Sequence, residues 1–286
     1  MKVGSSAIAG AQSLDTLTDQ HHRRKGLFQY LAEHNYSEVH GQGVQFVYGF
    51  PNGNSYSVFK EKLGWQMLDP VPFVFRPLRT GYFISKILSK VGLSKFGSRI
   101  DLPLPVLSHA LPMGFSVRKI SEFDAQHDRI WRLFSSDVKV AIDRTATYMN
   151  WRIFGRPDSE KYSVIGAFEG DRLVAEVMWC VEKKHGGRIG YLMEMLHDPA
   201  EPKAAHALMS EALRQIKKAG ADLVLGWNDA KYRNASVYRS AGFLSLPERY
   251  RPIELHWGVR PLDGSLVDIT TNRAAWYLSY LDSDTV

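Results

Sequence analysis

The stretch TLTDQHHRRKGLF, residues 16–28, decides the fold, and the helix-compatible QYLAEHNYSEVHG follows it at residues 29–41. A short polar-ended strand runs into a cluster of basic residues and a single glycine. Apolar side chains then recur on one side of a helix, at Leu27, Phe28, Leu31 and Ala32. The pattern therefore predicts a strand, a tight loop and the start of a helix.

The predicted loop is suited to bind a phosphate group. The unpaired amides of a first helical turn and the positive end of the helix dipole favour an anion there. Gly26 allows close approach of the backbone, and mobile positive charge comes from Arg23, Arg24 and Lys25. The loop is neither a dinucleotide fingerprint nor a P-loop, because it has one glycine and no Gly-Lys-Ser/Thr triplet. Taken alone, a basic surface turn before an ordinary helix explains it equally well.

The residues after this loop continue a known order of elements. The apolar run at residues 44–50 predicts a buried strand, and a short helix after Asn52 ends in Leu-Gly-aromatic. The order of strand, R-x-x-G-x-F loop, helix, strand, Asn and helix resembles the core of the GNAT superfamily of acyl-coenzyme A-dependent N-acetyltransferases. The family's loop is written Q/R-x-x-G-x-G/A, so Arg23 and Gly26 match while Phe28 replaces the final small residue.

The resemblance implies a binding site for an acyl-coenzyme A donor, acetyl-coenzyme A in the first instance. Residues 16–18 would lie where the strand splays, so that free backbone groups bond the pantetheine arm. Asn52 and Ser55, after the next strand, would add side-chain contacts. The implied donor-binding residues are Thr16, Leu17, Thr18, Arg23, Arg24, Lys25, Gly26, Leu27, Phe28, Asn52 and Ser55.

A second unit with the complete order of the family covers roughly residues 113–260. Strand-like alternation at residues 115–120 leads to two helical stretches, three strands joined by hairpin turns, and a helix with an i, i+3, i+4 stripe. A strand at LVLGW and a helix at residues 234–243 complete the order. The resemblance therefore implies an α/β (α+β) fold with two GNAT-like mixed β-sheet units flanked by helices, the first lacking its N-terminal strands.

The two units complement each other in the residues that carry chemistry. Residues 234–243 resemble the family's N-x-x-x-Y-x-x-x-G-F segment, whose tyrosine, here Tyr238, often protonates the leaving thiolate; the first unit has Lys60 at that position. The loop at residues 197–206 has two prolines and two acidic residues in place of R-x-x-G, so it offers fewer amides to a pyrophosphate. Glu194, in the preceding strand, is the candidate general base, although strand alternation places it equally well on the solvent face.

These units suggest a division of the chain into three parts. Residues 1–78 form a partial GNAT-like domain, residues 79–112 a basic linker, and residues 113–286 a complete domain with a C-terminal extension. Only about a dozen residues precede the first cofactor strand, so either the gene product is truncated or the missing strands come from elsewhere. An open half-sheet exposes strand edges, and we expect the second half of the chain or a second copy to cover them.

Composition and charge limit the function classes. The chain has 286 residues, of which 44% are hydrophobic and 23% charged, which suits one large or two ordinary globular domains. The basic linker supplies most of the net charge of +6, and no nucleic-acid-binding signature accompanies it, so we expect no nucleic-acid partner. Its helical stretch at residues 84–91 either docks on its own domain, which we favour, or lies on an anionic membrane.

Other residue types indicate location and reactivity. The single Cys180 excludes an internal disulfide, fits a reducing compartment and is more typical of a core residue than of a nucleophile. With no apolar run of ~20 residues and no signal peptide, the protein is expected to be cytoplasmic. His21 and His22 lack further ligands at suitable spacing, so no metal is expected. The aromatic string WYLSY, residues 276–280, predicts a packing strand.

Three functions are consistent with these features. The first is an acyl-coenzyme A-dependent N-acyltransferase, or acetyltransferase, acting on a small-molecule or carbohydrate amine. An amino sugar is suggested because tandem GNAT proteins of this kind are often associated with cell-surface polysaccharide biosynthesis. The second is a tandem aminoacyl transferase of the peptidoglycan type, which takes its acyl group from tRNA; the phosphate loop counts against it. The third is a non-catalytic GNAT-like protein that binds coenzyme A or serves as a scaffold.

Overall fold

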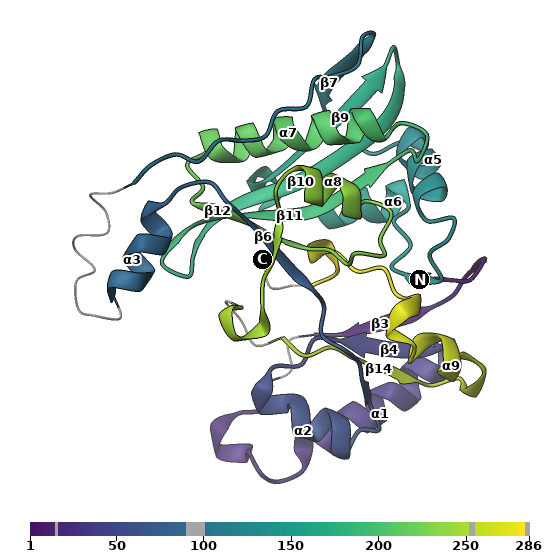
Figure 1. The fold of residues 1–286 in the computed structure, drawn as a ribbon. Coiled ribbons are helices and arrows are strands. Elements are labelled where there is room, and N and C mark those ends of the chain that lie inside the picture. Colours follow the sequence, from purple (N-terminus) through teal and green to yellow (C-terminus); the bar gives the residue numbers. More distant parts are fainter. Residues whose placement is uncertain (15–16, 90–100, 252–254, 284–286) are drawn as a thin grey trace.

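The protein consists of two lobes, each built on its own β-sheet (Figure 1). The computed structural model describes residues 1–14, 17–89, 101–251 and 255–283. In Figure 1 the seven-stranded sheet forms the upper lobe and a four-stranded sheet forms the lower one. This arrangement confirms the predicted mixed α/β architecture with two sheets flanked by helices.

The larger sheet follows the predicted order of the second unit. β10 pairs antiparallel with both β9 and β11, whereas β11 and β12 are parallel neighbours. Across the sheet the strands are β13 (Leu244–Ser245), β6 (Phe73–Pro77), β12 (Leu223–Trp227), β11 (Gly187–His197), β10 (Arg172–Lys184), β9 (Tyr162–Glu169) and β7 (Phe115–Lys119).

Helices cover both faces of this sheet. One face carries α5 (Ala125–Phe134) and α6 (Ala146–Met149), and the other carries α7 (Pro202–Lys218) and α8 (Ala235–Ser240). The predicted apolar stripe of α7 is buried against the strands, because nine of its residues are inaccessible to solvent. A π-helical turn at Asn150–Phe154 continues α6, so the second of the two predicted helical stretches is not one regular α-helix.

The smaller sheet carries the loop that the sequence predicts to bind phosphate. Its order is β3 (Gly10–Ser13), β4 (Phe46–Gly49), β14 (Gly258–Pro261) and β5 (Gln66–Met67), with β3 and β4 parallel. α1 (Leu27–Gly41) and α2 (Gly53–Glu61) cover one face around a core of Tyr36, Val47, Phe59, Leu63 and Trp65. The other face turns toward the larger lobe, where aromatic rings of both lobes form one continuous core.

The two sheets exchange strands. β6 comes from the first half of the chain but lies between β12 and β13, with Phe73 opposite Trp227. β14 comes from the second half but lies between β4 and β5, with Gly258 opposite Gly49. A division of the chain at residues 78 and 112 therefore does not separate the sheets, because each sheet contains a strand from the other half.

This exchange also bears on the open half-sheet. The second half of the chain supplies β14, which pairs with both β4 and β5 and completes that side of the sheet. β3 and β5 are the edge strands of this sheet, and on β3 the side chain of Gln12 donates to the Asp282 carbonyl oxygen at 2.9 Å. The expectation that a second copy of the chain covers an edge stays a prediction.

Short segments tie the lobes together. β1 (Lys2–Val3) pairs with β2 (Ser6–Ala7) and with β8 (Val140–Ala141). The C-terminal segment, which we define as residues 267–283, begins with α9 (Val267–Thr270) and runs between the lobes. Its WYLSY stretch buries its aromatic rings as predicted for packing, but it forms no regular strand and enters a 3₁₀ turn at Tyr280–Asp282.

The linker is partly described. α3 (Gly81–Ser89) follows β6, and Arg79 forms an ion pair with Asp101. Residues 101–112 then lie along α7, whose Lys217 donates to the Leu104 carbonyl oxygen at 2.6 Å. α3 agrees with the predicted helical stretch over residues 84–89, whereas residues 90–100 of the basic linker lie outside the described residues. Among the described helices, none has the length and apolar character needed to cross a bilayer.

Candidate functional site

The predicted donor-binding residues converge on one cleft. They come from two separate stretches of sequence, one after β3 and the other after β4, and both parallel strands end at the cleft. Its volume is about 810 Å³, within the usual range of roughly 300–1,000 Å³ for small-molecule sites. Predicted residues that line the cleft are Leu17, Thr18, Arg23, Arg24, Gly26, Leu27, Phe28, Asn52 and Ser55.

Helix α1 begins at this cleft with free backbone amides. Gly26 precedes the helix with φ of 75°, a left-handed conformation that glycine adopts without strain. Tyr30 is the first residue whose amide bonds back, to the Gly26 carbonyl oxygen at 3.0 Å. No described side chain caps the helix, so the amides of residues 27–29 can donate hydrogen bonds to an anion.

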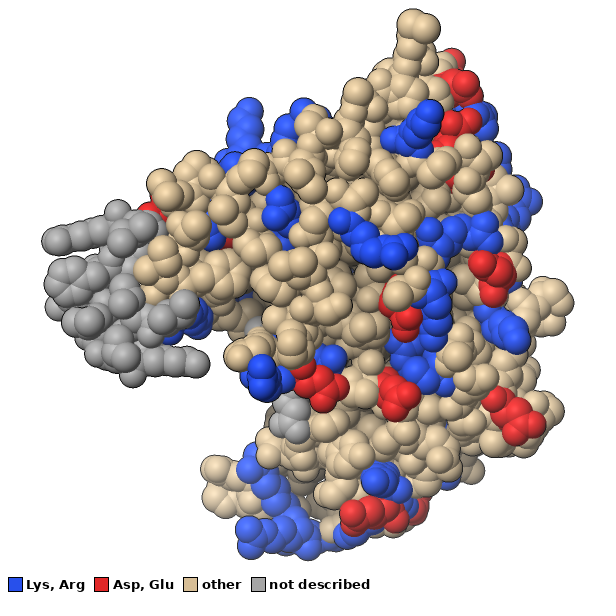
Figure 2. All heavy atoms as spheres, viewed as in Figure 1, with Lys and Arg blue, Asp and Glu red and all other residues tan. Residues whose placement is uncertain are grey.

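The surroundings of these amides are positively charged. Arg23 is held by a hydrogen bond from its Nε to the Thr18 carbonyl oxygen at 3.2 Å. Arg24 has φ of 63° and also lines the cleft, while Lys62 lies across from it at the end of α2. The described residues that line the cleft include no Asp or Glu. Figure 2 shows Lys and Arg gathered at the tip of the lower lobe.

The other predicted loop residues behave differently. Lys25 does not line the cleft, and its ammonium lies 3.4 Å from Nδ1 of His22. Thr16 lies outside the described residues. Within the described part of the chain, no group of three or more His, Cys, Asp and Glu side chains could hold a metal ion.

Asn52 and Ser55 have a structural task in addition to their place in the cleft. The Asn52 side chain caps α2 by accepting from the amides of Asn54 and Ser55, at 3.0 and 3.2 Å. The Asn52 amide nitrogen remains available to a ligand. Sequence reasoning missed five lining residues, of which Asn54, Val58 and Lys62 face the cleft at helical spacing; the others are His22 and Gln29.

The corresponding loop of the second half is filled by its own side chains. Asp198 follows β11, accepts from the Ala200 amide at 3.0 Å, and forms ion pairs with Arg129 and Arg172 at 3.2 and 3.5 Å. Pro202 removes one amide from the first turn of α7. The loop before α7 thus holds a carboxylate of the chain between two arginines, whereas the loop before α1 leaves amides free.

The gap between β11 and β12 is also filled. Pairing of the two parallel strands stops at Leu192 and Gly226. Beyond that point, Asn234 donates to the Met195 carbonyl oxygen at 2.8 Å and accepts from Asn228 at 2.8 Å. These buried side chains join the two strands beyond the point where their pairing stops.

Glu194 lies in the same region and is completely buried. Its Oε2 accepts from Arg144 Nε at 2.6 Å and from Ser279 Oγ at 2.9 Å. Its Oε1 accepts from the Tyr277 hydroxyl and from the Met195 amide at 2.8 Å. Strand alternation allowed Glu194 to face either solvent or the interior, and the structure places it in the interior. Each of its two carboxylate oxygens accepts two hydrogen bonds.

Arg144 connects this carboxylate to a second one. Its Nη2 donates to both Asp282 oxygens, at 3.0 and 2.9 Å. Burial alone would lower the pKa of Arg144, but the Asp282 and Glu194 carboxylates raise it. Burial raises the pKa of Asp282, which Arg144 opposes. The cluster therefore fixes the C-terminal segment to β11.

Tyr238 is buried with the residues between the sheet and α7. Its ring packs against Phe243, with centroids 5.0 Å apart, and lies next to Gly226. Burial, and secondarily the Glu194 carboxylate, raise its pKa well above the usual value. A role for Tyr238 in proton transfer stays a prediction, and the structure places its ring in the hydrophobic core.

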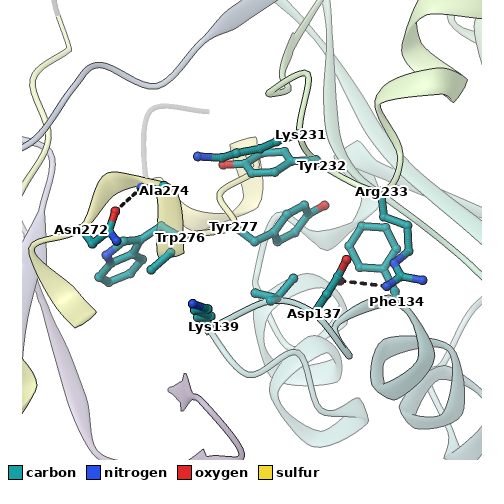
Figure 3. Close-up of a pocket in the computed structure, with 12 residues that line it drawn as sticks. Phe134, Asp137, Lys139, Lys231, Tyr232, Arg233, Asn272, Ala274, Trp276 and Tyr277 are labelled. Atoms are coloured by element: carbon teal, nitrogen blue, oxygen red, sulfur yellow. Dashed lines mark hydrogen bonds and ion pairs between the residues drawn. The ribbon is translucent and has the colours of Figure 1, made fainter. Parts of the chain in front are cut away.

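A smaller pocket adjoins this filled gap (Figure 3). It has a volume of about 210 Å³ and lies between the end of α5, the loop before α8 and the C-terminal segment. Tyr277 and Trp276 form part of its wall, and Arg233 pairs with Asp137 at 2.9 Å. The pocket is below the usual size of a small-molecule site, so it does not suit a complete acyl-coenzyme A.

Comparison with known proteins gives the fold a name. No protein-family model and no curated protein sequence matches the chain. Among solved structures, a GCN5-related N-acetyltransferase from Anabaena variabilis is 12% identical with a TM-score of 0.54, covering 85% of this chain and 52% of its own. Saccharomyces cerevisiae N-myristoyltransferase with bound myristoyl-CoA is 13% identical with a TM-score of 0.55, covering 91% and 61%. The chain thus spans between half and two thirds of these structures, and the likeness establishes a GNAT-like fold.

Proposed function

Because the chain has a GNAT-like fold, we propose that it is an acyl-coenzyme A-dependent N-acyltransferase whose donor site is the cleft at the start of α1. The observation that carries this proposal is the convergence of the residues after β3 and β4 around uncapped helix amides. Similar solved structures include an acetyltransferase and a myristoyltransferase with bound myristoyl-CoA, which supports an acyl donor of this class.

The cleft offers what the charged part of the donor requires. The amides of residues 27–29 point along the helix dipole toward a pyrophosphate, and Arg23 and Arg24 add charge-assisted hydrogen bonds. The Thr18 carbonyl oxygen accepts from Arg23, but the other backbone groups of Leu17 and Thr18 suit the amides of the pantetheine arm, because β3 and β4 stop pairing at Ser13 and Gly49.

The proposal includes one donor site for each chain. In the second half, the Asp198 carboxylate is already paired with two arginines, and Asn234 closes the gap between the strands. A donor would have to displace these buried hydrogen bonds, which is costly because each freed polar group would need a new partner. The first half presents no such obstacle among its described residues.

The reaction joins the acyl carbonyl carbon to an amine nitrogen and breaks the carbon–sulfur bond. The amine loses a proton and the departing thiolate gains or shares one. Glu194 and Tyr238 are not assigned to these steps here, since both are enclosed in the second half. We retain a small-molecule or carbohydrate amine as the acceptor, and acetyl-coenzyme A as the first donor to test.

Calorimetric titration with acetyl-coenzyme A tests the site directly. We expect one binding event per chain, removed by Arg23→Glu and unaffected by Lys203→Glu at the exposed start of α7. The two variants make the same charge change at corresponding helix starts. Two equivalent sites, or equal effects of the two variants, would contradict the proposal.

A second candidate is a binding protein without catalytic activity. It is favoured by Lys60, which stands at the position of the family's tyrosine and lies over the Tyr56 ring at 5.7 Å. Thiol release from acetyl-coenzyme A in the presence of a panel of amines separates the two candidates. Binding without thiol release would support the binding protein; transfer from aminoacyl-tRNA without coenzyme A binding would instead support the peptidoglycan-type transferase.

A further inference from the structure

An exposed apolar patch lies beside the donor cleft. The exposed fractions are 87% for Leu17, 40% for Leu27, 68% for Tyr30 and 60% for Leu31. Leu17 and Leu27 form the rim of the cleft, and Tyr30 and Leu31 continue the patch along α1 at i+3 and i+4. We call these four residues the rim patch. Single exposed apolar residues are common, whereas a group of them on one surface is typical of an interaction site.

Helix α1 has more apolar surface than its own lobe can cover. Phe28, Ala32 and Tyr36 form one stripe and pack against the small sheet. The stripe through Leu27, Tyr30 and Leu31 points elsewhere and is not part of any buried cluster of the described residues. A helix of a water-exposed surface normally carries polar residues there, so the second stripe marks an interaction surface.

Positive charge borders the same patch. Arg23, Arg24 and Lys25 are exposed, and within the described chain no carboxylate forms an ion pair with them. Glu33, one turn beyond Tyr30, is engaged by the side-chain amide of Gln29 at 3.0 Å. Apolar side chains next to unpaired basic ones are complementary to an anionic lipid surface, in which the apolar groups enter the interface and the cations meet the head groups.

We propose that the rim patch and the adjacent basic residues dock the small lobe on an anionic bilayer. The surface differs from the linker helix that the sequence suggested for such contact, and it does not depend on catalysis. Docking would hold the mouth of the cleft at the lipid surface, since Leu17 and Leu27 belong to both. The charge pattern favours lipid over a second copy of the chain, because two copies would bring like-charged basic clusters together.

Vesicle flotation tests this surface with residues outside the cleft lining. The full chain is mixed at physiological salt with vesicles of phosphatidylcholine alone or phosphatidylcholine with phosphatidylglycerol. We expect binding to the anionic vesicles only, weakened roughly tenfold or more by Tyr30→Ser with Leu31→Ser. Lys25→Glu should weaken it by at least fivefold, because each basic residue near such a surface contributes about that factor.

Matched controls distinguish docking from general stickiness. Leu102→Ser with Met113→Ser changes two side chains that are 63% and 99% exposed, and Lys218→Glu reverses an exposed charge on α7; all three should leave binding unchanged. Unchanged melting temperatures establish that the variants are folded. Absence of binding to anionic vesicles would overturn the proposal, as would equal loss in test and control variants. So would concentration-dependent dimerisation that Tyr30→Ser with Leu31→Ser abolishes while vesicle binding persists.

Discussion

Replacing Glu194 by glutamine separates a structural from a catalytic role for the only buried carboxylate that the sequence singled out. The change keeps the side-chain shape but removes the charge that faces Arg144. The amide oxygen of the glutamine can still accept hydrogen bonds. If its NH₂ group replaces Oε2, that group faces Arg144 Nε and Ser279 Oγ, which both donate in the wild type. Asp282 continues to pair with the other side of the guanidinium.

The expected loss of stability follows from this geometry. Removing one member of a buried ion pair typically costs about 3–5 kcal/mol. Because Asp282 remains, we expect the lower end, about 3 kcal/mol, and at roughly 2–4 °C per kcal/mol the melting temperature should fall by about 6–12 °C. Calorimetric or circular-dichroism melting measures this shift, and turnover well below the transition should remain close to wild type.

A general base would give the opposite result. Its loss would reduce turnover by about 10²–10⁴-fold whether or not stability changes. Glu122→Gln, at an exposed position, is the matched control and should alter neither quantity. A melting temperature within about 2 °C of wild type, together with such a loss of turnover, would refute the structural assignment of Glu194.

Three further outcomes are expected. Tyr238→Phe should leave turnover and melting temperature nearly unchanged, because the ring packs in the core; a loss of turnover above about 10²-fold would restore its predicted role as an acid. Gly26→Ala should weaken acetyl-coenzyme A binding in calorimetry by roughly 5–30-fold, because left-handed backbone costs other residues about 1–2 kcal/mol, and unchanged affinity would argue against the cleft. Burial lowers the pKa of His127, and the Glu176 carboxylate 2.5 Å away raises it. The net effect is a pKa above the ordinary histidine value of 6.5. The pair therefore contributes stability below pH 6.5 that is lost as the pH rises through the raised pKa, so the melting temperature should fall above pH 6.5 and His127→Gln should flatten that slope.

Local sequence patterns predicted most elements and the general fold, but they could not identify strand partners. Alternation of apolar and polar residues shows where a strand lies in the sequence and which residues share a face, as in residues 115–119 and 162–169. It does not say which edge accepts the strand, because that depends on residues more than a hundred positions away. The exchange of β6 and β14 is such a long-range pairing, and it was not predicted.

The same distinction applies to the candidate site. The loop before α1 was predictable as a local structure because glycine, basic residues and a helix start are consecutive in sequence, and the structure places most of them at one cleft. The environment of Glu194 was not predictable, because Arg144, Tyr277 and Ser279 reach it from distant segments. The sequence showed Asp198 only as an acidic residue in a loop that lacks R-x-x-G. Its ion pairs could not be predicted, because the two arginines lie on α5 and β10.

The strand exchange constrains how the protein is made. Gly49 leaves the ribosome 209 residues before its partner Gly258, from the difference of the two positions. At typical elongation rates of 5–20 residues per second, β4 waits about 10–40 s for the strand that pairs with it. During that time the nascent chain carries an unsatisfied edge, which invites association with neighbouring polypeptides. Synthesis of this protein should therefore place a particular demand on chaperones that shield emerging chains.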